Sequence, residues 1–167
     1  MNIYEAFEIY GLLTCNYGDL ERSHEIFTED FVGGNSTAGQ LRGVEAQRIF
    51  LNTAREMGLE PEDHLWSLVD GTNLTFRFRQ WAGVKYESPF FDGIGHLAFD
   101  DERRKFCYYH GFFDARTAIE VLSASATCSM SVAAKGMQDA QRATADFLAL
   151  SGSASKLPDE FRVSSAI

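Results

Sequence analysis

The sequence predicts a single α+β domain in which helices precede a meander of strands and a further helix follows. Residues 2–16 place apolar side chains at three- and four-residue steps, as an amphipathic helix does. After Pro61 the pattern changes to short runs of aromatic and β-branched residues separated by turn residues. At 167 residues the chain has the length of one ordinary domain. Neither an internal repeat nor a linker rich in Pro and Gly divides it.

Three helices are expected before the strands. Asp19 caps the second of them, which is short. A brief extended piece follows at residues 30–32, and the small and polar residues at 33–43 are expected to form a loop instead of a core strand. The third helix covers residues 43–57.

Four strands in meander order are then expected, because three turn signals separate the extended runs. These signals are DGTN at 70–73, AGVK at 82–85 and DDER at 100–103. Beyond the last strand the sequence predicts a helix around 137–150, followed by a polar tail at 151–167 that we expect to be mobile.

Composition excludes several classes of partner. With 24 acidic and 15 basic side chains the formal charge is −9, so the surface repels phosphate backbones and we expect no nucleic acid partner. Cys15, Cys107 and Cys128 are too widely spaced for a zinc-type CxxC pair and are expected to be free thiols in a reducing compartment. No run of about 18 apolar residues and no signal peptide is present, which predicts a cytoplasmic protein without a membrane partner.

The aromatic content and the missing motifs bear on function. The 14 Phe, 6 Tyr and 2 Trp are many for this length, so their rings must line either a core or a cavity. The sequence contains no HExxH, GxGxxG, GxxxxGK[ST] or GxSxG motif. We therefore expect neither a metal nor a cofactor.

Three passages carry a resemblance to a known family: FTEDFVGG at 27–34, RGVEAQRIF at 42–50 and the closing GFFDARTA at 111–118. Over roughly residues 2–118 the chain resembles the SnoaL-like branch of the nuclear transport factor 2-like superfamily. The resemblance implies a curved antiparallel sheet that forms a cone, with N-terminal helices packed over a central pocket. Residues 1–120 would form this cone domain, and 121–167 would add a C-terminal helix and polar tail to the same domain.

Members of this superfamily catalyse polyketide cyclisation, epoxide hydrolysis, ketosteroid isomerisation and scytalone dehydration, so the resemblance narrows function only to a pocket. Similarity to limonene epoxide hydrolase would place a catalytic Asp three residues before the final Asp of the closing strand. Gly111 occupies that position here. A direct transfer of the Asp-Arg-Asp mechanism therefore fails at one of its two carboxylates.

The turns predict which side chains share a face, because side chains alternate along a strand. The first turn pairs Trp66 with Arg77 and His64 with Arg79. The second turn places Arg77 opposite Phe90 and makes Asp92 a diagonal neighbour of Arg77.

The third turn pairs His96 with Cys107, Ile94 with Tyr109 and Asp92 with Gly111. Asp92 could then fill the space that the missing carboxylate leaves. Arg77 would keep Asp92 ionised while desolvation by aromatic rings raises its pKa. The predicted catalytic residues are Asp92, Arg77, His96 and Tyr109, and the predicted substrate-binding residues are Trp66, Phe90, Ile94 and Tyr17.

Structural alternatives remain open for each of these residues. Arg77 and Arg79 can instead pair with acidic side chains on the convex side of the sheet, and Asp92 with the following glycine can form a turn or bulge. His64 and His96 can be histidines of the core or rim. The aromatic residues from the helices can simply pack in the core, and one bulge in a strand would exchange its two faces.

The sequence thus favours a cofactor-independent acid–base enzyme of secondary metabolism that acts on a hydrophobic oxygenated small molecule, such as a polyketide- or terpenoid-like intermediate. Its reaction would be that of a cyclase, isomerase, dehydratase or epoxide hydrolase. The alternative is a non-catalytic small-molecule-binding or dimerisation module of the same fold. An outer sheet face bearing Phe91, Tyr108 and Phe112 predicts a homodimer.

Overall fold

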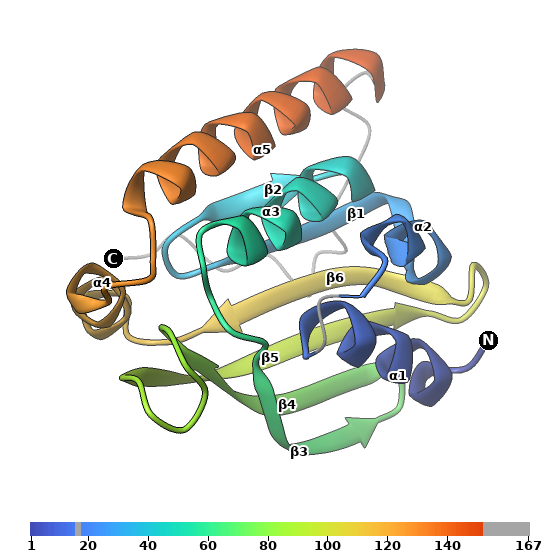
Figure 1. The fold of residues 1–167 in the computed structure, drawn as a ribbon. Helices are drawn as coiled ribbons and strands as arrows, with labels where there is room; N and C mark the ends of the chain where they lie inside the picture. The colour runs from blue at the N-terminus through green and yellow to red at the C-terminus, as the bar shows by residue number, and fades with distance from the viewer. Residues whose placement is uncertain (16–17, 152–167) are drawn as a thin grey trace, which may run out of the picture.

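The computed structural model describes residues 1–15 and 18–151, and the C-terminal tail expected from residue 151 falls almost entirely outside this part of the chain. The fold combines helices with one curved sheet (Figure 1). In chain order the elements are α1 (Ile3–Thr14), the 3₁₀ turn η1 (Leu20–Arg22), α2 (Ser23–Ile26), β1 (Phe27–Asn35), β2 (Gly39–Arg42), α3 (Val44–Glu56), β3 (Asp63–Asp70), β4 (Asn73–Trp81), β5 (Phe90–Asp100), β6 (Lys105–Phe112), α4 (Ala115–Ala124) and α5 (Met130–Ser151).

The sheet has the strand order β2-β1-β6-β5-β4-β3. The predicted antiparallel meander is confirmed as β3 to β6. The sheet as a whole is mixed, since β1 runs parallel to β6. These features confirm the predicted α+β class with a curved sheet, although the sheet is not purely antiparallel.

The prediction of a loop at 33–43 is wrong, because β1 continues to Asn35 and pairs with β2. The glycines in this stretch permit close contacts instead of marking a loop. A side chain at Gly33 would collide with the amide of Gln47, and one at Gly34 would collide with the backbone of Gly39.

Three helices complete the pocket side of the fold. The predicted third helix is confirmed as α3, whereas the trailing helix begins earlier than expected, at Met130. Asp114, predicted to cap the turn after the last strand, caps the unpredicted α4 by accepting a 2.6 Å hydrogen bond from the Thr117 amide. Helix α5 packs along α3 and against β2, with Gly136 directly against Thr53 (Figure 1).

The core lies between α1 and the inner face of the sheet. Gly93 and Gly95 of β5 leave room for the rings of Phe78 and Phe76, which cross over them from β4. The largest fully buried side chains of this core are Tyr10, Phe27, Phe31, Phe76 and Phe106. Among the described residues, no helix is both long and apolar enough to cross a membrane.

Candidate functional site

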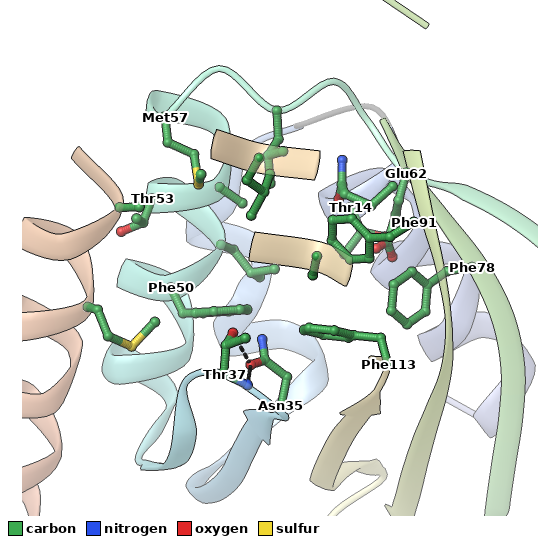
Figure 2. A pocket seen from close by; sticks show the side chains of 18 of the residues that line it. Thr14, Asn35, Thr37, Phe50, Thr53, Met57, Glu62, Phe78, Phe91 and Phe113 are labelled. Carbon is green, nitrogen blue, oxygen red and sulfur yellow. Dashed lines mark hydrogen bonds between the residues drawn. The ribbon is translucent and has the colours of Figure 1, made fainter. Parts of the chain in front are cut away.

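A pocket of about 320 Å³ lies between the inner face of the sheet and the helices (Figure 2). This volume falls within the range of sites that bind small molecules. Most of its wall is apolar and comes from the sheet, from α3 and from both C-terminal helices. The large apolar side chains that line it are Phe50, Leu51, Met57, Leu59, Phe78, Phe91, Phe113, Ile119, Leu122, Met130 and Met137.

Polar groups lie at separate places in the wall. In Figure 2, Thr14 and Glu62 lie in the upper right part of the pocket, and Asn35 and Thr37 lie below its centre. Glu62 is the one charged side chain among the described residues that line the pocket. No group of three His, Cys, Asp or Glu side chains in the described chain could hold a metal ion.

The carboxylate of Glu62 pairs with His64 just behind the pocket wall. The distance from His64 Nε2 to Glu62 Oε1 is 2.8 Å, and both side chains are nearly buried. Burial alone would lower the pKa of His64, but interactions with Cys15 and Glu62 outweigh it and raise this pKa to about 9. At neutral pH the pair is therefore an imidazolium bound to a carboxylate.

Aromatic rings and a hydroxyl hold the imidazole of His64 in place. It stacks on Phe7 at a centroid distance of 5.2 Å and on Tyr10 at 5.7 Å. Its Nε2 also lies 3.3 Å from the hydroxyl of Thr14, which itself donates to the carbonyl of Tyr10. The faces of these rings favour a cation, so they support the charged form of the imidazole.

Tyr10 and Tyr109 place two buried hydroxyls near Glu62. The pKa of each is raised well above that of free tyrosine, chiefly by burial and further by the charge of Glu62. Both phenols therefore stay protonated and can donate hydrogen bonds. The Tyr109 hydroxyl lies 2.6 Å from where a Cβ on Gly111 would be. Tyr109, and not the predicted Asp92, thus fills the space beside Gly111.

Asn35 presents a hydrogen-bond donor to the pocket. Its Oδ1 accepts bonds from Thr37 N at 2.9 Å, Thr37 Oγ1 at 2.9 Å and Ala38 N at 2.7 Å. Because these donors fix which atom of the amide is oxygen, the other atom is the Nδ2 group. Figure 2 shows this nitrogen pointing into the pocket between Phe50 and Phe113.

A β-bulge explains why the predicted faces of the sheet are partly wrong. Phe99 pairs with Phe106 but Ala98 pairs with Tyr108, so Cys107 is an extra residue in β6. The bulge turns Tyr109 to the inner face, opposite Leu97 and not opposite Ile94 as expected. The predicted pairs of Gly111 with Asp92 and of Cys107 with His96 are wrong because of this bulge and because the turn lies one residue later than predicted, with Asp100 opposite Lys105.

Asp92 and Arg77 are neighbours as predicted, but on the outer face of the sheet. Arg77 Nη2 donates to Asp92 at 2.6 Å, and Arg79 donates twice, at 2.7 and 3.0 Å. The bonds from Arg79 and then Arg77 hold the pKa of Asp92 below its usual range. Arg79 in turn lies over the Phe90 ring, 3.8 Å from its centroid. This arrangement matches the structural alternative of a surface ion pair.

The connection between β4 and β5 is longer than the predicted four-residue turn. Trp81 pairs with Phe90, so Arg77 lies opposite Ile94 and Arg79 opposite Asp92. The shift is by an even number of residues, which leaves the face of Asp92 relative to Arg77 unchanged.

The other predicted pocket residues also lie on the outer face. His96 pairs with His110, has its Nδ1 3.2 Å from the Thr75 hydroxyl, and has a pKa lowered by burial. Trp66 and Phe90 are 47% and 40% exposed, and Ile94 follows the same alternation as Asp92. The prediction that Trp66, Phe90, Ile94, Asp92, Arg77 and His96 face the pocket is therefore wrong. Tyr109 does line it, and Tyr17 lies outside the described residues.

Sequence reasoning missed Glu62 and placed His64 on one face with Trp66 and Arg77, whereas His64 lies on the inner face and the other two lie on the outer face. Trp66 pairs with Arg77 as predicted, but His64 pairs with Phe78 because the register shifts between them. The spacing of Glu62 and His64 at the start of a strand was the available signal, since residues two apart point to the same side. The outer face exposes Trp66, Leu68 and Phe112, and the homodimer stays a prediction.

Replacing Asp92 with asparagine should affect stability and not the pocket. Asp92→Asn is expected to lower the free energy of unfolding by about 1 kcal/mol, since partly exposed ion pairs contribute little. The affinity of the pocket for the neutral probe 1-tetralone should stay unchanged. Denaturant unfolding and calorimetric titration measure the two quantities, with Asp101→Asn at an exposed hairpin tip as the control. A marked loss of affinity in Asp92→Asn would contradict this assignment.

No protein-family model matches the sequence, and no curated protein matches it. Solved structures do. A protein from Jannaschia sp. CCS1 named as a SnoaL-like polyketide cyclase matches with a TM-score of 0.58 at 15% identity, over 72% of this chain and 93% of that one. A limonene epoxide hydrolase-like enzyme of M. tuberculosis matches with a TM-score of 0.58 at 14% identity, over 80% and 91% of the two chains.

TerC, crystallised with polyporic acid, matches with a TM-score of 0.61 at 13% identity, over 72% of this chain and 98% of TerC. Identities this low show a shared fold and leave the chemistry of each protein separate. The resemblance inferred from the sequence is thereby confirmed at the level of the fold. This chain therefore shares its fold with proteins named as SnoaL-like and NTF2-like.

Proposed function

We propose that the pocket is the active site of a cofactor-independent acid–base enzyme that acts on a neutral, hydrophobic, oxygenated small molecule. The observation that carries the proposal is the Glu62 carboxylate, the one charged group among the described residues of a mostly apolar pocket wall, which His64 holds from behind at 2.8 Å. A carboxylate in such a place has a fixed position and little competing water. These are the conditions under which general-base catalysis is effective.

The charges of the wall favour a neutral substrate. None of the described residues lining the pocket is Lys, Arg or His, so an anionic substrate would meet Glu62 without any countercharge in the wall. The charge of Glu62 is already paired with the imidazolium of His64. A polyketide- or terpenoid-like ketone suits the aromatic wall, and the names of the similar structures are consistent with this class.

The proposed step moves one proton. Glu62 accepts a proton from the carbon beside a carbonyl group, and the electron pair of the broken C–H bond moves to the carbonyl oxygen as an enolate. The protonated hydroxyl of Tyr109, which shares a side-chain hydrogen bond with Tyr10, donates a hydrogen bond to that oxygen. Glu62 then returns the proton to the same carbon or to another one. Return to another carbon is isomerisation. In cyclisation the enolate carbon instead attacks a second carbonyl of the substrate, and the oxygen of that carbonyl takes the proton from Glu62.

Hydrogen exchange tests this function without knowledge of the natural substrate. The protein in D₂O should accelerate incorporation of deuterium beside the carbonyl of 2-tetralone by at least about 100-fold over buffer, as general-base catalysis permits. Mass spectrometry of the recovered ketone measures the rate. Binding of the ketone without accelerated exchange would contradict the proposal and favour the alternative of a non-catalytic binding module.

A further inference from the structure

Gln47 is a buried residue of the pocket wall whose amide has no partner. The residue is 1% exposed, and neither Oε1 nor Nε2 makes a hydrogen bond within the described chain. Thr28 Oγ1 is the other buried side-chain atom in that condition, and Thr28 does not line the pocket. An unpaired buried amide destabilises the fold, so its retention in a pocket wall calls for a partner that arrives with the ligand.

The second pocket-lining glutamine, Gln80, shows what a satisfied amide looks like in this wall. Its Nε2 donates to the carbonyl of Glu60 at 2.5 Å and to that of Trp81 at 3.3 Å. Gln80 thus links strand β4 to the connection that precedes β3. Gln47 has no such structural task.

Gln47 and Asn35 lie close together. The Gln47 Oε1 lies directly over Gly33, where it occupies the space of the missing side chain. Asn35 is two residues further along β1 and on the same face, about 7 Å away along the strand. Its Oδ1 is already used by Thr37 and Ala38, which leaves Nδ2 as a donor toward the pocket.

We propose that Gln47 and Asn35 form a subsite for a carbonyl-type oxygen of a neutral ligand, apart from the Glu62 end of the pocket. Both can supply N–H donors, and Glu62 is the one charged side chain among the described pocket residues, so no described cation of the wall offers an alternative anchor for an oxygen. The inference rests on the proposed function in one respect, namely that the pocket receives a small molecule. It implies a substrate oxygenated at two positions, one at Glu62 and the other at Gln47 and Asn35. The Tyr109 hydroxyl also lies near Asn35, because a Cβ on Gly111 would be 2.6 Å from that hydroxyl and 3.4 Å from Asn35 Cβ.

Affinity measurements with matched probes test the subsite without requiring turnover. Calorimetric titration compares 1-tetralone with tetralin, which lacks the carbonyl, on the wild type and on Gln47→Met. The preference for the ketone should fall about tenfold in Gln47→Met, while the affinity for tetralin stays unchanged. Asn35→Asp keeps the acceptor for the loop and removes the donor, so it should also reduce the preference.

Thermal unfolding without ligand provides an independent readout. Gln47→Met should raise the midpoint by about 2–6 °C, because an unpaired amide is replaced by an apolar side chain of similar length. Gln80→Met, the matched control, should lower it. Gln47→Leu is measured in parallel in case methionine packs poorly.

Three results would overturn the subsite. The first is an unfolding midpoint that both Gln47 variants lower, because the amide of Gln47 would then already have hydrogen-bond partners in the native protein. The second is an unchanged ketone preference in those variants together with a loss in Tyr109→Phe, and the third is no binding of 1-tetralone at all. Exchange of 2-tetralone hydrogens without this ketone preference would refute the subsite and leave the proposed catalysis standing. A preference for 1-tetralone over tetralin without exchange of 2-tetralone hydrogens would support the subsite and refute the proposed catalysis.

Discussion

Glu62→Gln should abolish most of the deuterium exchange that the protein catalyses in 2-tetralone, with a fall in rate of at least about 100-fold. Glutamine has nearly the shape of glutamate but cannot accept the proton. It still offers an oxygen to His64, whose Nε2 lies 2.8 Å from the carboxylate in the native protein. The loss is therefore expected in the rate, and the affinity for the ketone should change little.

A neighbouring acidic residue provides the control for that experiment. Glu60 lies in the same connection before β3, but it does not line the pocket. The Glu60→Gln variant should catalyse deuterium exchange in 2-tetralone at the native rate. Circular dichroism should show that both variants are folded. If Glu62→Gln retained the native rate, another group would have to be the base and the proposed mechanism would be wrong.

The stability of the protein should decrease steeply between about pH 6.5 and pH 9 because of His64. Its pKa is raised from 6.5 to about 9 in the folded chain, so folding favours the protonated imidazole. The stabilisation is complete below pH 6.5, where the unfolded chain is protonated too. It is lost as the pH rises through 9, where the folded chain releases its proton. The shift corresponds to a decrease of up to about 3 kcal/mol.

His64→Gln should remove this pH dependence. Urea unfolding at intervals from pH 6 to pH 9.5 should give a nearly flat free energy for the variant, lower than that of the native protein at pH 6. His110→Gln is the matched control, because burial lowers the pKa of His110 whereas the pKa of His64 is raised. A native protein equally stable at pH 6 and pH 9 would show that His64 is not held as an imidazolium.

The order of the elements could be predicted from the sequence because it depends on periodicity and turn residues. The meander from β3 to β6 and the helix α3 follow directly from those signals. The hairpin of β1 and β2 could not, since its glycines serve close contacts with Gln47 and with the neighbouring strand. A glycine kept for contact and a glycine kept for a turn look alike in a sequence.

The faces of the sheet were harder to predict because alternation depends on an exact count of residues. The longer connection after Trp81 shifted the register by an even number and left the relation of Arg77 to Asp92 intact. The single extra residue Cys107 shifted it by an odd number and separated Asp92 from Tyr109. An acid–base group inferred across two turns was thus divided between the inside and the outside of the sheet.

Helix α5 shapes the pocket but does not carry Glu62. It supplies Met130, Ala133, Ala134 and Met137 to the wall, yet it packs on α3 and β2 and not on the strand that follows Glu62. Substitutions along this helix can widen, narrow or reshape the cavity while Glu62, the proposed base, stays in place. The range of molecules that fit the pocket can therefore change through one helix without any change at Glu62.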